Sequence, residues 1–227
     1  MKRSVFWPVL LLATAAVVLA VLLPGGRAPE PPRHLPWQIE VLPNGTSRVF
    51  GITLGHTTLD EMERILKAEG EVSLFVDGDG RKVVEAYFND VTLDGLKARM
   101  VAVLGFGGAR LEALFDRGAR IAGLAEGERK VTLSAEDRRL AGRTPVVAVT
   151  YLPRIDLDEE ILLQRFGAPA RRIREPEGGV VHWLYPEKGL DLAVSPEAKE
   201  VLQYVPPRDF DRLVVAPLER AAAAFQE

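Results

Sequence analysis

An uninterrupted apolar run near the N-terminus most constrains what this chain can fold into. The run extends from Val5 to Leu23 and follows Lys2 and Arg3. At about 1.5 Å per residue, a helix of this length spans roughly the 30 Å hydrocarbon core of a bilayer. It predicts a transmembrane anchor over residues 5–23 and, by the positive-inside rule, a cytoplasmic N-terminus over residues 1–4.

A cleaved signal peptide is the alternative interpretation of this run. Signal peptides have shorter apolar cores, of about 7–15 residues, and end at an A-x-A-like site. The run here is longer and is followed by Pro24-Gly25-Gly26. An uncleaved signal-anchor is therefore favoured. It predicts a single-pass protein of the inner (cytoplasmic) membrane that contacts the lipid bilayer through residues 5–23, with its C-terminal domain in the periplasm or outside.

The remaining chain divides into a tether and two predicted modules. Residues 24–36 read PGGRAPEPPRHLP, a composition typical of an extended, polyproline-like segment. Folded structure is expected from Trp37 onward. We expect a first α+β module over residues 37–152, and a second over residues 153–227 that includes a C-terminal helix.

An internal repeat supports the two modules. At an offset of 97 residues, six of the 30 positions from 65 to 94 are identical between the copies. Gly70 falls on Gly167, and Leu93-Asp94 falls on Leu190-Asp191. The predicted fold class is α+β: two tandem helix-plus-antiparallel-sheet modules behind an N-terminal transmembrane helix. Two such modules can join their sheets edge to edge or share a core, which hides exposed edge strands.

Helix boundaries are predicted from capping residues. Thr58 with Glu61 has the spacing of a capping box, and Asp156 is the expected N-cap of a later helix. Gly70 and Gly167 are expected to end these two helices. The apolar periodicity predicts helices over residues 58–69, 109–124 and 157–166.

Two short motifs resemble the small modules of the BamE (SmpA/OmlA) type. The first is Gly55-His56-Thr57-Thr58, which leads into an amphipathic helix; the second runs from Leu162 to Pro169 and precedes a strand with Trp183-Leu184-Tyr185. The beta-lactamase inhibitor protein is similar in fold and has two such modules in tandem. The resemblance implies a non-enzymatic, protein-binding module of the cell envelope with an envelope protein as its partner.

Composition excludes several classes of site. The chain has no cysteine, so disulfides, thiolate metal sites and a cysteine nucleophile are excluded. The formal net charge of −3 makes nucleic acid a poor partner, because phosphate binding needs a basic surface. Asp77-Gly78-Asp79-Gly80 lacks the other acidic positions of a calcium loop and is interpreted as a hairpin turn. We therefore predict no catalytic residue, no metal site and no cofactor.

The candidate binding residues are His182, Trp183, Tyr185 and Tyr204. Trp183 and Tyr185 share one face of a strand because side chains alternate. If that face is exposed, it is a protein-binding surface; if it faces the helices, it is core, which is the favoured alternative.

Two functions remain open. A protein-binding or scaffolding module is favoured, and an envelope hydrolase acting on cell-wall or lipid material is the alternative. A cleft that joins His56 or His182 to acidic residues would favour the hydrolase, whereas a broad exposed sheet face would favour binding.

Overall fold

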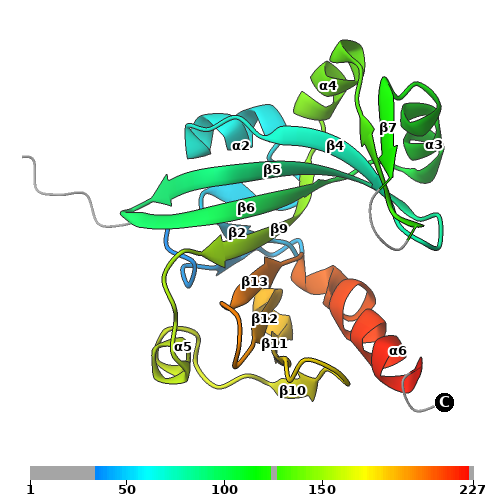
Figure 1. Cartoon of the computed structure of the whole chain (residues 1–227). Helices are drawn as coiled ribbons and strands as arrows, with labels where there is room; N and C mark the ends of the chain where they lie inside the picture. Colours follow the sequence, from blue (N-terminus) through cyan, green and yellow to red (C-terminus); the bar gives the residue numbers. More distant parts are fainter. Residues whose placement is uncertain (1–33, 124–126, 225–227) are drawn as a thin grey trace, which may run out of the picture. The chain divides into compact units, whose positions relative to one another are not determined.

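The computed structural model describes residues 34–123 and 127–224 (Figure 1). All of them belong to one compact unit, Arg33–Glu227. Most of this unit is antiparallel sheet, with helices packed against it.

One ten-stranded antiparallel sheet runs through the unit, in the order β10-β11-β12-β13-β9-β6-β5-β4-β8-β7. The pairing register is regular in most strand pairs. It shifts once between β5 and β6 and once between β6 and β9. The strands are β4 (Glu71–Val76), β5 (Lys82–Leu93), β6 (Leu96–Leu104), β7 (Arg120–Gly123), β8 (Arg129–Thr132), β9 (Val146–Pro153), β10 (Arg171–Arg174), β11 (Val181–Tyr185), β12 (Leu190–Val194) and β13 (Val201–Tyr204).

A small sheet and several helices surround the large sheet. The small sheet has the order β1-β2-β3 and precedes the first helix in the chain. Its strands are β1 (Glu40–Val41), β2 (Ser47–Val49) and β3 (Ile52–Thr53). The helices are α2 (Leu59–Leu66), α3 (Gly108–Asp116), α4 (Ala135–Gly142), α5 (Glu159–Phe166), the 3₁₀ turns η2 (Pro186–Lys188) and η3 (Pro207–Asp209), the π-helix η4 (Asp211–Val215) and α6 (Ala216–Ala224).

The start of α2 follows the capping pattern in the sequence. The Thr58 backbone N–H donates to the Glu61 carboxylate at 2.9 Å, and the Glu61 N–H donates to the Thr58 hydroxyl at 3.4 Å. This confirms the predicted capping box. The helix ends earlier than expected, because Lys67 adopts a left-handed conformation with φ 52°.

The predicted fold class is wrong. Strand β9 pairs with β6 on one side and with β13 on the other. The strands of both predicted modules therefore belong to a single sheet, and sheet dominates the described residues. The order of a helix followed by three antiparallel strands does occur twice, as α2-β4-β5-β6 and α5-β10-β11-β12.

The membrane predictions are corrected as well. Within residues 34–123 and 127–224, no helix has both the length and the apolar character needed to cross a bilayer. This finding contradicts the predicted transmembrane helix, the signal-anchor and the single-pass inner-membrane localisation. The predicted span, residues 5–23, lies outside the described residues.

Three aromatic side chains pack where β9 meets β13. The Phe50 ring stacks on Tyr151 with ring centres 5.1 Å apart, and it meets Tyr204 edge-on at 5.3 Å. All three side chains are buried. Aromatic pairs in these geometries add to the free energy of burial, by about 0.5–1.5 kcal/mol each. The strand that joins the two halves of the sheet is therefore held by packing as well as by backbone hydrogen bonds.

The described end of the predicted tether lies against the folded unit. The His34 backbone N–H donates to the Asp94 carboxylate at 2.6 Å. Pro36 is buried, and its carbonyl accepts a hydrogen bond from the Tyr204 hydroxyl at 2.9 Å. Residues 34–36 are therefore part of the folded structure.

Candidate functional site

One face of the large sheet is only half covered. A row of side chains crosses four strands on this face, because Tyr87 pairs with Val101, Val101 with Thr150, and Thr150 with Gln203. Glu85 lies next to Tyr87 along β5 on the same face. We call the surface made by Glu85, Tyr87, Val101, Thr150 and Gln203 the open face. Every one of these side chains is half-buried or exposed, and Tyr87 is 36% exposed.

The alternation along β5 explains why this face is open. Val84, Ala86 and Phe88 point to the other side of the sheet and are buried in the main core. Helix α2 packs against β5 and contributes buried Leu59 to this core. Glu85 and Tyr87 must therefore face away from α2.

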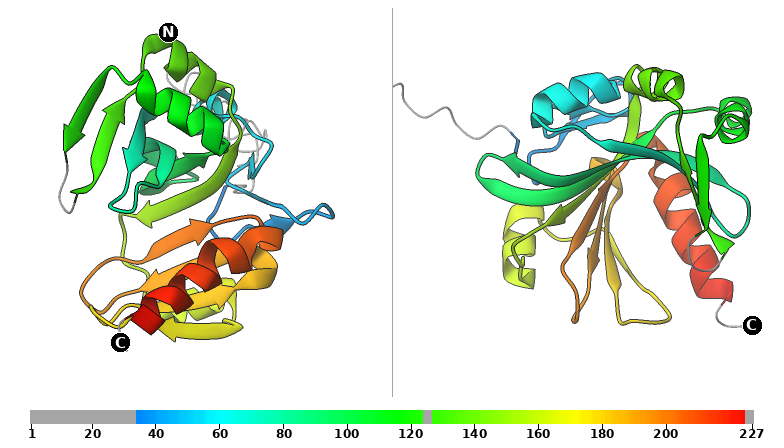
Figure 2. Two further views of the ribbon diagram at one scale, coloured as in Figure 1. Left: turned by 90° about the vertical axis from the view of Figure 1, so that its right-hand side faces the viewer. Right: turned by 45° about the horizontal axis from the view of Figure 1, so that its top comes forward.

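Helix α6 covers the far half of the same face. Leu184 on β11 packs with Phe210 and Val214 in a second apolar cluster, and Leu218 of α6 packs against it. The ribbon views show α6 alongside β10–β13, whereas β4 and β5 lie away from it (Figure 2). The helix thus covers one part of the face and leaves the open face accessible.

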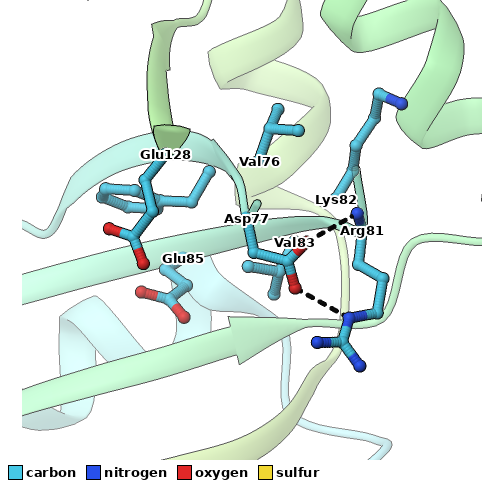
Figure 3. Close-up of a pocket in the computed structure, with 8 residues that line it drawn as sticks. Val76, Asp77, Arg81, Lys82, Val83, Glu85 and Glu128 are labelled. Carbon is cyan, nitrogen blue, oxygen red and sulfur yellow. Dashed lines mark hydrogen bonds and ion pairs between the residues drawn. The ribbon is translucent and has the colours of Figure 1, made fainter. Parts of the chain in front are cut away.

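A pocket of about 340 Å³ lies at the β4–β5 end of the open face (Figure 3). Phe75, Val83, Glu85 and Glu128 contribute to its walls. Burial raises the pKa of the Glu85 carboxyl. Within the part of the chain that the structure describes, no hydrogen bond or ion pair reaches this carboxylate. Glu85 is therefore a half-buried acceptor that is available to a ligand group.

The turn beside this pocket is a hairpin, as predicted. Asp77 accepts hydrogen bonds from the backbone N–H groups of Asp79 and Arg81, at 3.0 and 2.8 Å. The Arg81 guanidinium donates to the Asp77 carboxylate at 2.7 Å, which lowers the pKa of that carboxyl. These bonds account for the acidic residues of the turn without a metal ion.

His182 lies between two carboxylates. Its Nδ1 is 2.9 Å from an Asp191 oxygen, and its Nε2 is 2.9 Å from a Glu175 oxygen. His182 and Asp191 are buried, with 8% and 4% of their surface exposed. Burial lowers the pKa of His182, but the hydrogen bonds that its ring makes to the Asp191 and Glu175 carboxylates more than offset this effect, so the pKa is raised overall.

We call the cluster of His182, Asp191 and Glu175 the ion bridge. Both ring nitrogens contact carboxylates, so the bridge is complete when both carry a proton. No ring nitrogen then remains to take a proton from a substrate or a nucleophile. His182 is only 8% exposed, so a substrate has little access to its ring.

The three aromatic candidates are core residues. Trp183, Tyr185 and Tyr204 are all buried, and the Tyr185 hydroxyl donates to the Gly167 carbonyl at 2.9 Å. This is the alternative that the sequence analysis favoured for the aromatic face. His182 points to the opposite side of β11 from Trp183, so the four candidates do not form one surface.

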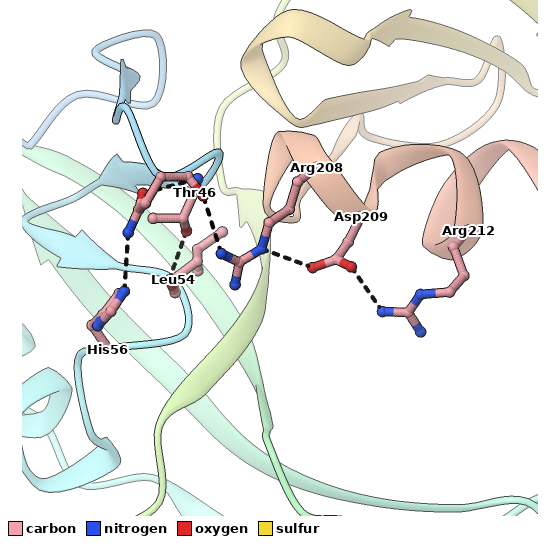
Figure 4. Close-up of polar contacts among 7 residues, drawn as sticks. Thr46, Leu54, His56, Arg208, Asp209 and Arg212 are labelled. Atoms are coloured by element: carbon pink, nitrogen blue, oxygen red, sulfur yellow. Dashed lines mark hydrogen bonds and ion pairs between the residues drawn. The ribbon is translucent and has the colours of Figure 1, made fainter.

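His56 belongs to a separate, exposed polar network (Figure 4). Its Nε2 lies 3.3 Å from the Asn44 side-chain nitrogen. Arg208 donates to the Asn44 carbonyl at 3.1 Å, and Arg212 donates to Asp209 at 3.0 Å. The network ties the turn between β1 and β2 to η3, and it brings no acid to His56.

The sequence analysis missed the open face. Its signal was present in residues 83–88, where apolar side chains alternate with Glu85 and Tyr87. Periodicity gives the two faces of a strand but does not say which one a helix covers.

In the described ranges, no group of three or more His, Cys, Asp and Glu is placed to hold a metal ion.

The chain gives no match when it is compared with protein-family models, with curated proteins or with solved structures. Function is therefore inferred from the geometry and chemistry of the described residues.

Proposed function

We propose that this chain is a non-enzymatic protein-binding module that contacts its partner through the open face. The observation that supports this proposal is the row Tyr87, Val101, Thr150 and Gln203, which is half exposed on a rigid sheet. Tyrosine is enriched at the centre of interfaces, and Val101 adds apolar surface beside Tyr87. The BamE-type resemblance implies the same class of function.

The chemistry around the open face suits recognition better than catalysis. Glu85 offers a carboxylate beside the aromatic ring of Phe75 in the pocket at its end. His182, the one buried histidine among the described residues, is held in the ion bridge. A partner with an apolar centre and a hydrogen-bond donor for Glu85 fits this surface.

Crosslinking pull-down of the full-length chain from its native cells, read by mass spectrometry, tests this proposal. We expect Val101→Asp and Tyr87→Ala to lose a specific partner protein, because a charge or a cavity at the centre of an interface typically costs 2 kcal/mol or more, about 30-fold in affinity. Glu69→Ala is the matched control, since Glu69 is exposed beyond the end of α2 on the other side of the sheet.

Thermal unfolding of each variant separates loss of binding from loss of fold. If folded Val101→Asp retains the partner as well as the wild type does, the open face is not the binding surface. If the wild-type chain recovers no specific protein, the binding function itself is wrong.

A further inference from the structure

Strand β10 is a free edge of the ten-stranded sheet. It has a single neighbour, β11, in the strand order. The Glu175 N–H donates to the Val180 carbonyl at 2.9 Å. Because hydrogen-bonded and non-hydrogen-bonded pairs alternate along an antiparallel pair, Ile173 is the next hydrogen-bonded residue of β10. The N–H and C=O groups of Arg172 and Arg174 therefore point away from β11. A strand that arrives at this edge finds backbone donors and acceptors ready to pair.

The two sides of β10 differ in chemistry. Ile173 packs with the apolar cluster that Leu218 of α6 also joins. On the other side, the Arg172 guanidinium lies 4.2 Å from the centre of the Trp183 ring. An added strand would therefore meet Ile173 and the Arg171–Glu219 ion pair on one side, and the cations Arg172 and Arg174 on the other.

The cations of the edge are available to a new carboxylate. Arg172 bonds Glu159 at 3.3 Å, and both side chains are about half exposed. Exposed pairs of this kind contribute little, about 0–1 kcal/mol, so the exchange of one carboxylate for another costs little. Arg174 is exposed, and among the described residues no carboxylate pairs with it.

A pocket of about 350 Å³ lies between β10 and α6. Its lining combines apolar Ile173, Pro176, Leu218 and Ala221 with charged Arg174, Glu175 and Glu177. The pocket lies on the Ile173 side of the strand, where alternate side chains of an added strand would point. Its volume is sufficient for one aliphatic side chain.

We propose that β10 binds an extended segment of a partner protein in which acidic and apolar residues alternate. The backbone of the segment pairs with Arg172 and Arg174, its carboxylates face their guanidinium groups, and an apolar side chain enters the pocket beside Leu218. Charged side chains on a free edge also discourage non-specific pairing. A row of arginines therefore selects against cationic segments and admits acidic ones. This site goes beyond the open face and uses different residues.

Fluorescence anisotropy with the full-length chain and short labelled peptides tests this proposal. The probe is a peptide of alternating glutamate and valine, and the comparison peptide has lysine in place of glutamate. We expect the wild type to bind only the acidic peptide, and Arg174→Glu to weaken that binding at least about tenfold, since a charge-assisted hydrogen bond is lost and a repulsion is gained. Arg143→Glu, with the same charge change at an exposed site after α4, should bind as the wild type does.

Arg174→Pro tests strand pairing independently of charge reversal. It removes an N–H that points away from β11, so the sheet itself keeps its hydrogen bonds. We expect weaker binding than for Arg174→Ala, which keeps the N–H. Equal binding of acidic and lysine peptides, equal losses in Arg174→Glu and Arg143→Glu, or no binding by the wild type would overturn the proposal. Because Val101→Asp should leave peptide binding unchanged, failure here and failure of the open face are distinguishable.

Discussion

At the scale of single residues, the buried charges are matched by geometry. Asp191 is almost fully buried, and it contacts His182, which carries a positive charge when both ring nitrogens are protonated. Asp137 is also buried, and Arg117 donates to it at 2.6 Å, which lowers the pKa of the carboxyl. Breaking a fully buried pair leaves an uncompensated charge, which costs about 3–5 kcal/mol; the Arg117 side chain is 55% exposed, so its pair with Asp137 contributes less.

The His182 bridge predicts that stability falls as the pH rises. The pKa of His182 is raised in the folded state above its ordinary value of about 6.5. Its stabilisation is therefore complete below that value and is lost as the pH rises through the folded-state pKa. Urea unfolding at a series of pH values should show this loss in the wild type.

His182→Gln should remove this pH dependence and lower the free energy of unfolding by about 3 kcal/mol at low pH. His56→Gln is the control, because His56 is exposed and has no acidic partner. A pH dependence that survives in His182→Gln would contradict the bridge.

Residue patterns predicted only some of the helix ends, since α2 ends at Leu66 and not at Gly70. The Thr58 cap and the stop at Gly167 are both present. The cap of α5 is Asp158 and not Asp156, since Asp158 accepts from the Ile161 N–H at 2.8 Å. Asp156 has Glu159 three residues later and so fits the capping-box pattern, whereas Asp158 caps the helix with Ile161 at that position.

At the scale of elements, the helix expected over residues 109–124 is wrong. Helix α3 ends at Asp116, and residues 120–123 form β7, which pairs with β8. The apolar spacing in this stretch is compatible with both structures. Gly118 marks the change, because a Cβ there would lie 2.2 Å from Val131 Cγ1 of β8. Contact with a strand that comes later in the chain therefore overrides the helical pattern.

Gly118→Ala tests this contact. We expect a loss of about 1–3 kcal/mol in the free energy of unfolding, because Val131 is fully buried and cannot move freely. Gly123→Ala is the matched control, since a Cβ there meets nothing within 4 Å. In chemical denaturation, Gly118→Ala combined with Val131→Ala should cost less than the sum of the two single changes. Additive losses would show that the two positions do not touch.

At the scale of the whole described unit, the sequence analysis allowed the two sheets to join edge to edge, but it did not predict that β9 and β13 make the join. Each strand was visible as a β-branched or aromatic run, but pairing between strands so distant in sequence leaves no local signal. The open face was missed for a related reason. Which face of β5 stays uncovered depends on where α2 and α6 pack, and strand periodicity does not contain that information.

A pair of tyrosines tests the join. Tyr204 and Tyr151 both contact Phe50, but the Tyr204 hydroxyl donates to the buried Pro36 carbonyl. Tyr204→Phe should therefore lower the free energy of unfolding by about 1–2 kcal/mol, because an acceptor is left unsatisfied. Tyr151→Phe keeps the stacking, and no hydrogen bond of its hydroxyl is present among the described residues. In urea denaturation we expect a much smaller effect for Tyr151→Phe, and equal effects would contradict the assigned role of the hydroxyl.

The central position of β9 has a consequence during translation. Its partner β6 precedes it, but β13 leaves the ribosome roughly 50 residues later, a delay of several seconds at about 5–20 residues per second. During this interval the sequence VVAVTYLP presents an unpaired, apolar edge. A nascent chain of this protein is therefore exposed to mispairing and to capture by chaperones until its last strand is synthesised.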